Sequence, residues 1–233
     1  MVTRRRPHNS PGWTALARHR WLVLAPHPDD ETLGAGALIA HASKTGMLKA
    51  VVYLTDGGGS HPVRGTARKR LVQERCREAW RAIQRLSGRQ ARRPIHLGWR
   101  DAQPHTPDSP KFLDTLACLT SLVRRRRITA IAVTSLDDPH CDHQVAARLA
   151  HACAATPGVA ARIYEYGIWT DTPPRRVICY RTPPVSTGKR RAALQCHRSQ
   201  LTGAFGNGFR LPREFRTMPA ADLLYSRRYA HAV

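Results

Sequence analysis

A series of short apolar runs, separated by segments of helix length, most constrains the fold of this chain. The runs lie at residues 21–25, 50–55, 95–97 and 128–133. Strands that alternate with helices of this length are typical of parallel β-α-β units. The sequence therefore predicts an α/β fold, a single-domain Rossmann-like sandwich with a mostly parallel sheet and helices on both faces.

The segments around these runs give the predicted domain organisation. Helices are expected at 31–43, 66–87, 112–125 and about 187–200, and later strands at 162–169 and 177–181. Gly34 and Gly36 inside the first helix indicate close packing or a frayed first turn. Residues 1–20 contain five arginines and no apolar signal segment, so we expect a basic, loosely ordered arm before one domain at 21–233.

A dense polar cluster directly follows the first apolar run. Pro26 and Pro28 end the strand, because proline cannot donate to a sheet ladder, and His27, Asp29 and Asp30 come with them. Open α/β sheets bind ligands at the carboxyl ends of their strands. A divalent metal would stabilise so many polar groups at this place. The alternative is an Asp-rich turn that caps the next helix.

A second cluster follows the run at 128–133. It contains His140, Asp142 and His143, just before a helical pattern. Residues three apart lie on one face of a helix, so the two histidines are expected to point the same way. Two such clusters at strand ends predict a metal site divided between two loops.

Both clusters match motifs of a known family. Pro26-His27-Pro28-Asp29-Asp30-Glu31 resembles the first signature of the PIG-L/LmbE-like deacetylases, which include N-acetylglucosaminyl deacetylases, and His140-Cys141-Asp142-His143 resembles their His-x-Asp-His motif. Weaker similarities follow in order over roughly residues 21–215: Thr55-Asp56-Gly57, Ser60-His61-Pro62, Arg75-x-x-Glu78, 97–101 and 189–200.

The residues themselves suggest which ion would bind. His27, Asp30 and His143 offer two nitrogens and one oxygen, which suits Zn²⁺ and also accommodates Fe²⁺, Co²⁺ or Mn²⁺. The resemblance implies the same three positions as metal ligands. From the residues alone, Asp29 is the alternative carboxylate ligand, with Asp30 preferred.

The remaining polar residues of the two motifs are candidates for catalysis. Asp29 is expected to act as general base and then as general acid, or to brace its loop. His140 is expected to donate to the developing oxyanion. Asp142 either holds the His140 ring and favours its protonated form, or caps the following helix. Glu31 is expected to stabilise a helix N-terminus.

Four further residues are candidate substrate contacts. The resemblance implies that Arg75 and Asp101 lie near the sugar, although Arg75 fits an exposed helix face almost equally well. His197 and Gln200 are expected to bring a C-terminal helix to the rim of the pocket.

The net charge of +22 raises the question of an anionic partner. Of 38 basic residues only five are lysine, a bias that GC-rich coding produces, and no basic recognition motif with interleaved aromatics occurs. The four arginines at 124–127 fall at an expected helix end, where cations are favourable. We therefore expect no specific nucleic-acid partner, and a basic surface that can attract anionic or lipid-linked glycans.

Cysteine usage and hydropathy suggest where the protein works. The six cysteines form no Cys-x-x-Cys pair, which predicts reduced thiols and a cytoplasmic location. Cys141 is expected to point away from the metal, the alternative being a soft ligand. No segment approaches the ~20 apolar residues of a membrane helix, so only peripheral membrane contact stays open.

These observations predict a zinc-dependent amidohydrolase. The resemblance implies removal of an N-acetyl group from an amino sugar of the N-acetylglucosamine type, within a glycolipid, envelope glycan, thiol-cofactor precursor or natural product. One alternative is a catalytically silent, basic glycan- or nucleic-acid-binding module on the same fold. Another is a metal phosphoesterase, which usually requires more carboxylates than this chain offers.

Overall fold

The computed structural model describes residues 12–170 and 172–227, and its centre is a seven-stranded sheet. The strand order is β3-β2-β1-β4-β5-β7-β6. The strands are β1 (Trp21–Ala25), β2 (Leu48–Thr55), β3 (Ile95–Trp99), β4 (Ala130–Thr134), β5 (Arg162–Tyr166), β6 (Val177–Arg181) and β7 (Leu223–Arg227). The pairings among β1 to β5 are all parallel, which confirms the predicted class.

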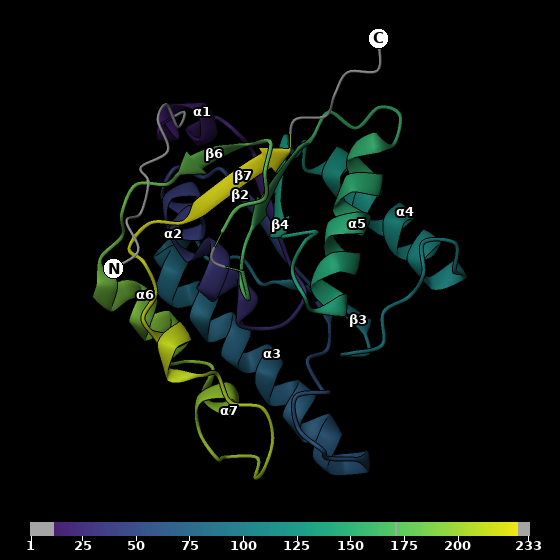
Figure 1. Ribbon diagram of the computed structural model, residues 1–233, viewed down its shortest axis with the longest axis vertical. Helices are drawn as coiled ribbons and strands as arrows, with labels where there is room; N and C mark the ends of the chain where they lie inside the picture. The colour runs from purple at the N-terminus through teal and green to yellow at the C-terminus, as the bar shows by residue number, and fades with distance from the viewer. Residues whose placement is uncertain (1–11, 171, 228–233) are drawn as a thin grey trace.

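Helices cover both faces of this sheet (Figure 1). On one side lie α2 (Asp30–Lys44), α3 (Gly65–Ser87) and α6 (Thr187–Leu194), and on the other α4 (Pro110–Arg125) and α5 (Cys141–Ala155). The short helices α1 (Trp13–Ala17) and α7 (Arg198–Leu201) and the 3₁₀ turns η1 (Gly88–Gln90) and η2 (Arg213–Arg216) complete the described elements.

The central strands are buried on both faces, as their unbroken apolar runs predict. Side chains alternate along β1, so that Trp21, Val23 and Ala25 enter one core cluster while Leu22 and Leu24 enter the other. All five side chains are fully buried. Because β1 is buried on both faces up to Ala25, the polar residues that follow it lie at the end of the strand.

Strand β7 was not predicted from the sequence. It lies antiparallel between β5 and β6, with Glu165 opposite Tyr225. Its few apolar residues follow a segment rich in Gly and Pro, so they carry no strand pattern of their own. The sheet therefore has a mixed edge at the end that is far from β3.

Three local predictions differ from the structure. The expected helix at 187–200 is two helices, α6 and α7, with a break at 195–197. The expected strand at 162–169 ends at Tyr166. The expected loose arm covered residues 1–20; residues 1–11 lie outside the described part, whereas α1 packs its buried Leu16 into the core.

The close packing expected at the first helix is present. A Cβ at Gly34 would lie 2.0 Å from the Tyr166 ring, so only glycine fits there. The C-terminal helix α6 is tied to the same helix by Arg190, which pairs with Asp222 at 2.7 Å and donates to the carbonyl of Thr32. None of the helices in the described ranges is long and apolar enough to cross a membrane.

Candidate metal centre and active site

The candidate site lies where the strand order reverses. The chain leaves β1 towards β2 on one side, and β4 pairs with β1 on the other side, so the loops after β1 and β4 are neighbours. Ligand sites of open α/β sheets form in this crevice, outside the carboxyl ends of the strands. The first loop carries His27 and Asp30, and the second ends at the start of α5 with His143.

Three atoms from these loops lie at mutual distances that suit one metal ion. Nδ1 of His27 is 3.1 Å from Oδ2 of Asp30, and Nε2 of His143 is 3.3 Å from each of these two atoms. Tetrahedral zinc with bonds of about 2.0–2.1 Å separates neighbouring ligand atoms by about 3.3 Å. The set of His27, Asp30 and His143 therefore fits such an ion, and it is the set expected from the sequence.

The second nitrogen of each histidine faces a carboxylate. Nε2 of His27 lies 3.0 Å from Oδ2 of Asp142, and Nδ1 of His143 lies 3.1 Å from Oδ1 of Asp138. Histidines that bind metals almost always have such an outer partner, which fixes the ring orientation. Nothing in the sequence pattern distinguished Asp138 from its neighbour Asp137, so its place here was missed.

A second group of potential ligands shares His27. It consists of His27, Asp101, His140 and Asp142. In this group Asp142 would be a ligand and not the orienting partner of His27. The first group has both histidines supported by carboxylates outside the group, and we therefore favour it.

Asp29 is buried beside the candidate ligands in an unusual backbone conformation. Its φ of 138° lies in the region that favours glycine, and its amide donates to Oε2 of Glu31 at 2.9 Å. Burial, only partly offset by the nearby Arg75, raises the pKa of Asp29 to about 6. Strained residues of this kind cluster at functional sites. Asp29 is thus a carboxyl group whose pKa suits proton transfer near neutral pH.

Arg75 is buried, which excludes the exposed helix face that was one of its two predicted places. Only 2% of the residue is exposed, and its guanidinium donates to the carbonyls of Pro28 and Gly57, each at 2.7 Å. Nη2 also lies 3.4 Å from Oδ1 of Asp29. Arg75 therefore holds the two loops together and does not lie on an exposed helix face, and its Nη1 is 3.9 Å from Oδ2 of Asp101. Its predicted contact with the sugar stays a prediction.

The predicted roles of Asp142 are also corrected. Its carboxylate does not contact the His140 ring but reaches Nε2 of His27 and accepts from the amide of Ala102 at 2.8 Å. Asp142 does not cap α5 either, since Nδ1 of His140 accepts the Asp142 amide at 3.2 Å. Burial, together with His27 and His143, lowers the pKa of His140, while Asp142 and Asp30 act in the opposite direction.

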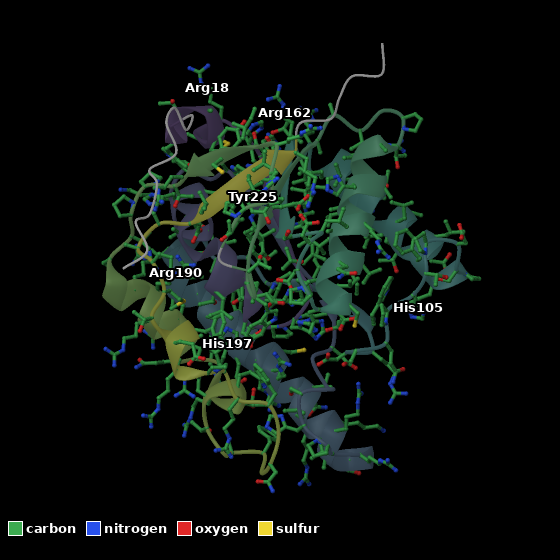
Figure 2. All side chains as sticks on the ribbon, in the orientation of Figure 1. Arg18, His105, Arg162, Arg190, His197 and Tyr225 are labelled. Carbon is green, nitrogen blue, oxygen red and sulfur yellow. The ribbon has the colours of Figure 1, made fainter. Side chains whose placement is uncertain are left out.

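Two residues of the C-terminal part contact the segments that carry the site. His197 and Glu31 are fully buried, with Nε2 of His197 3.2 Å from Oε1 of Glu31, and Figure 2 shows His197 on the segment next to α7. Gln200 is buried and donates to Oγ of Ser60 at 3.4 Å. Gln200 thus contacts the loop after β2, and His197 contacts the first turn of α2. Their expected place at the rim of the pocket stays a prediction.

A comparison of the sequence with models of protein families shows to which family the chain belongs. The model of the PIG-L family, described as GlcNAc-PI de-N-acetylase, matches residues 22–154, which is more than half of the chain. The chain belongs to the PIG-L family. No protein with a curated description matches it.

Solved structures show the same PIG-L fold. N,N'-diacetylchitobiose deacetylase from Pyrococcus horikoshii is 21% identical, with a TM-score of 0.64 over 81% of this chain and 73% of that chain. The A40926 pseudoaglycone deacetylase is 16% identical, with a TM-score of 0.61 over 90% and 97% of the two chains. The 4-carboxy-2-hydroxymuconate hydratase from Pseudomonas putida, 18% identical, has a TM-score of 0.61 over 91% and 98%. Because a hydratase shares the fold, the fold alone does not select the reaction.

Two other residues singled out in the sequence of this PIG-L protein lie differently relative to the site. Asp101 lies at its edge, with Oδ1 3.3 Å from Nε2 of His27 and Oδ2 accepting the Gly59 amide at 3.0 Å. Cys141 is exposed and belongs to neither ligand group. All six cysteines are free thiols.

Proposed function

We propose that this PIG-L protein is a zinc-dependent N-deacetylase that acts on an N-acetylated amino sugar of the N-acetylglucosamine type. The observation that carries the proposal is the set of three ligand atoms at 3.1–3.3 Å from one another, with the carboxyl group of Asp29 beside them and outside the set. Fe²⁺, Co²⁺ or Mn²⁺ would suit the same ligands. The name of the matched family and those of the deacetylases with this fold support the choice of reaction.

His27, Asp30 and His143 would hold the ion. When bound, such an ion lowers the pKa of water to about 7, against ~15.7 in bulk, and polarises an acyl oxygen. Asp142 and Asp138 would keep the two imidazole rings in the orientation that binding requires.

Asp29 would move the proton. As a carboxylate it takes a proton from the water whose oxygen attacks the acetyl carbon, and it returns that proton to the nitrogen when the C–N bond breaks. The products are acetate and a free amine. Its burial fits this task, because a raised pKa makes the same group a stronger base for the first step and an available acid for the second.

His140 would stabilise the charge that develops on the acyl oxygen. Since its Nδ1 accepts the Asp142 amide, the proton of the neutral ring is on Nε2, which is therefore a hydrogen-bond donor. The ring packs edge-on against His27, with centroids 4.8 Å apart, so this donor lies beside the proposed metal ligands. Asp101 is the candidate contact for a sugar hydroxyl. We also place the protein in the cytoplasm, because all six thiols are free.

The test is deacetylation by the purified, zinc-loaded protein. We expect slow release of acetate and free amine, in equal amounts, from a simple N-acetylglucosamine glycoside, and loss of the activity after treatment with a chelator. Replacement of zinc should restore turnover. Absence of acetate release with every divalent metal tried would overturn the proposal, as would equal activity in the chelated protein.

A further inference from the structure

The backbone of Asp29 is strained, and it therefore depends on the groups around it. Its φ of 138° lies in a region that residues with a side chain rarely adopt, directly before the first residue of α2. A conformation of this kind persists only where the surrounding structure holds it in place. The groups that hold it are expected to control where the carboxyl group of Asp29 points.

Glu31 is one of these groups. Its side chain is fully buried, and Oε2 accepts the amide of Asp29 at 2.9 Å. Oε1 accepts the hydroxyl of Thr32 and lies 3.2 Å from Nε2 of His197. A buried carboxylate is costly unless donors satisfy both of its oxygens. The position of Glu31, and with it the position of the Asp29 amide, thus depends on these donors.

His197 is the donor that comes from a distant part of the chain. It lies between α6 and α7, 166 residues after Glu31, and is fully buried (Figure 2). Its Nδ1 has no hydrogen-bond partner among the described residues, so in that part of the chain Glu31 is the only hydrogen-bond partner of the ring. The proposed chemistry gives this buried imidazole no task of its own.

Arg190 ties the same C-terminal segment to the same turn. Helix α2 is kinked at Ala35, whose φ of −129° is not helical. Kinks of this kind arise where a side chain inserts into the hydrogen-bond ladder of a helix. Arg190 donates to the carbonyls of Thr32 and Leu33, which lie just before the kink. The first turn of α2 is therefore held from outside by the segment that carries His197.

We propose that His197 is a positioning residue for the general base: it holds the carboxylate of Glu31, which in turn holds the backbone amide of Asp29. The C-terminal segment then takes part in the reaction, although it lies beyond residues 22–154 that the family model matches. This inference rests on the proposed function, because His197 acts through the residue that we propose as the base.

The first test is the steady-state kinetics of zinc-loaded His197→Phe and His197→Gln. Phenylalanine keeps a buried ring but removes the donor, whereas glutamine keeps a side-chain N–H that can reach Glu31. We expect His197→Phe to lower kcat by about tenfold or more, with little change in KM or zinc content, because a displaced catalytic group reacts poorly. His197→Gln should recover most of kcat.

An unchanged kcat in His197→Phe would overturn the inference, as would an equal loss in both variants. If His197→Phe does not fold, His197→Asn replaces it, because its amide is too short to reach Glu31. His197→Asn should then lose kcat while His197→Gln keeps it. Equal kcat in these two variants would also overturn the inference.

Ser199→Ala is the matched control. Ser199 is fully buried on the same segment, and its hydroxyl donates to Oε2 of Glu78 on α3. The control also removes a donor from a buried glutamate, but not from the turn that carries Asp29. It should leave kcat nearly unchanged. A loss of kcat as large as that of His197→Phe would assign the effect to the packing of the whole segment and overturn the inference.

A double-mutant cycle tests whether His197 acts through Glu31. Glu31→Gln keeps an oxygen that can accept the Asp29 amide but weakens the contact with the imidazole. Residues that act through one contact show non-additive effects. The loss of kcat caused by His197→Phe should therefore be smaller in the Glu31→Gln background than in the wild type. Losses that simply add would overturn the inference.

Failure of the proposed function can be recognised separately, because hydrogen exchange requires no turnover. In the zinc-loaded protein the buried Asp29 amide should exchange slowly, as followed by NMR. His197→Phe should speed this exchange by about tenfold or more, and Ser199→Ala should not. This result in a protein without deacetylase activity would leave the positioning contact standing and the function refuted. Equal exchange in all three proteins would overturn the inference.

Discussion

The guanidinium of Arg75 lies 3.4 Å from the carboxylate of Asp29, and both side chains are buried. The same side chain donates to the carbonyl oxygens of Pro28 and Gly57. One buried arginine thus joins the loop after β1 to the loop after β2. Its position suggests that it sets the orientation of the proposed general base.

Replacing Arg75 by Lys should lower kcat by about tenfold or more, because a lysine cannot donate to two carbonyls and a carboxylate with the planar fork of arginine. KM and metal content should change little. Steady-state kinetics and metal analysis check this. Arg77→Lys, on the exposed side of α3, is the control. A raised KM with normal kcat would instead identify Arg75 as a substrate contact.

Replacing Asp29 by Asn should lower kcat by at least ~100-fold, the scale expected for a general base. Metal content should be retained. Thermal stability should be equal or higher, because the variant no longer buries a carboxyl group and Asn tolerates positive φ well. Kinetics together with a melting curve measure both effects. Normal turnover would exclude Asp29 as the base.

The carboxylate behind His143 should matter for metal affinity. Asp138→Asn is expected to weaken zinc binding by about 10–100-fold, the usual effect of losing such an outer partner. Competition with a chromophoric chelator gives the affinity. The neighbouring Asp137→Asn is the matched control, since Asp137 is exposed and pairs with Arg227. Equal affinities in the two variants would contradict this role of Asp138.

The buried carboxyl group of Glu165 should make the free energy of unfolding depend on pH. Burial alone would raise the pKa of this carboxyl group, but His151 and Arg227 donate to it and hold its pKa at about 2. Because the folded pKa is depressed below the usual 4.5, the stabilisation is present above about pH 4.5 and is lost as the pH falls towards 2.

Glu165→Gln should therefore destabilise the protein by about 2–3 kcal/mol at pH 7, and by roughly half as much near pH 3. Urea unfolding at both pH values measures the difference. Glu74→Gln, which removes only surface pairs on α3, should cost less than about 1 kcal/mol at either pH. A Glu165→Gln effect that does not change with pH would contradict the assigned pKa.

Much of the architecture was predictable because each central parallel strand is an unbroken apolar run that can be recognised in the sequence. The run at 21–25 and the run at 128–133 are both buried on two faces, and polar motifs follow both, so the approach of His27 to His143 could be inferred. Strand β7 could not, because its few apolar residues follow a segment rich in Gly and Pro and carry no strand pattern of their own.

The errors within the site have a common physical origin. Arg75 lies among other arginines in the sequence, and only the three-dimensional packing distinguishes the buried one from Arg77. The partner of Asp142 depends on which edge of the His27 ring faces it, and spacing along the chain does not determine that. Sequence motifs therefore indicated which residues lie close together, but not which of their atoms are in contact.

The measurement that tests the account most directly is the zinc content of two histidine variants, with the wild type as reference. We predict about one zinc per chain for the wild type and for His140→Ala, and none for His143→Ala. The opposite pattern, with zinc lost from His140→Ala and kept in His143→Ala, would place the ion in the second group, with Asp101 and Asp142, and would contradict the proposed centre.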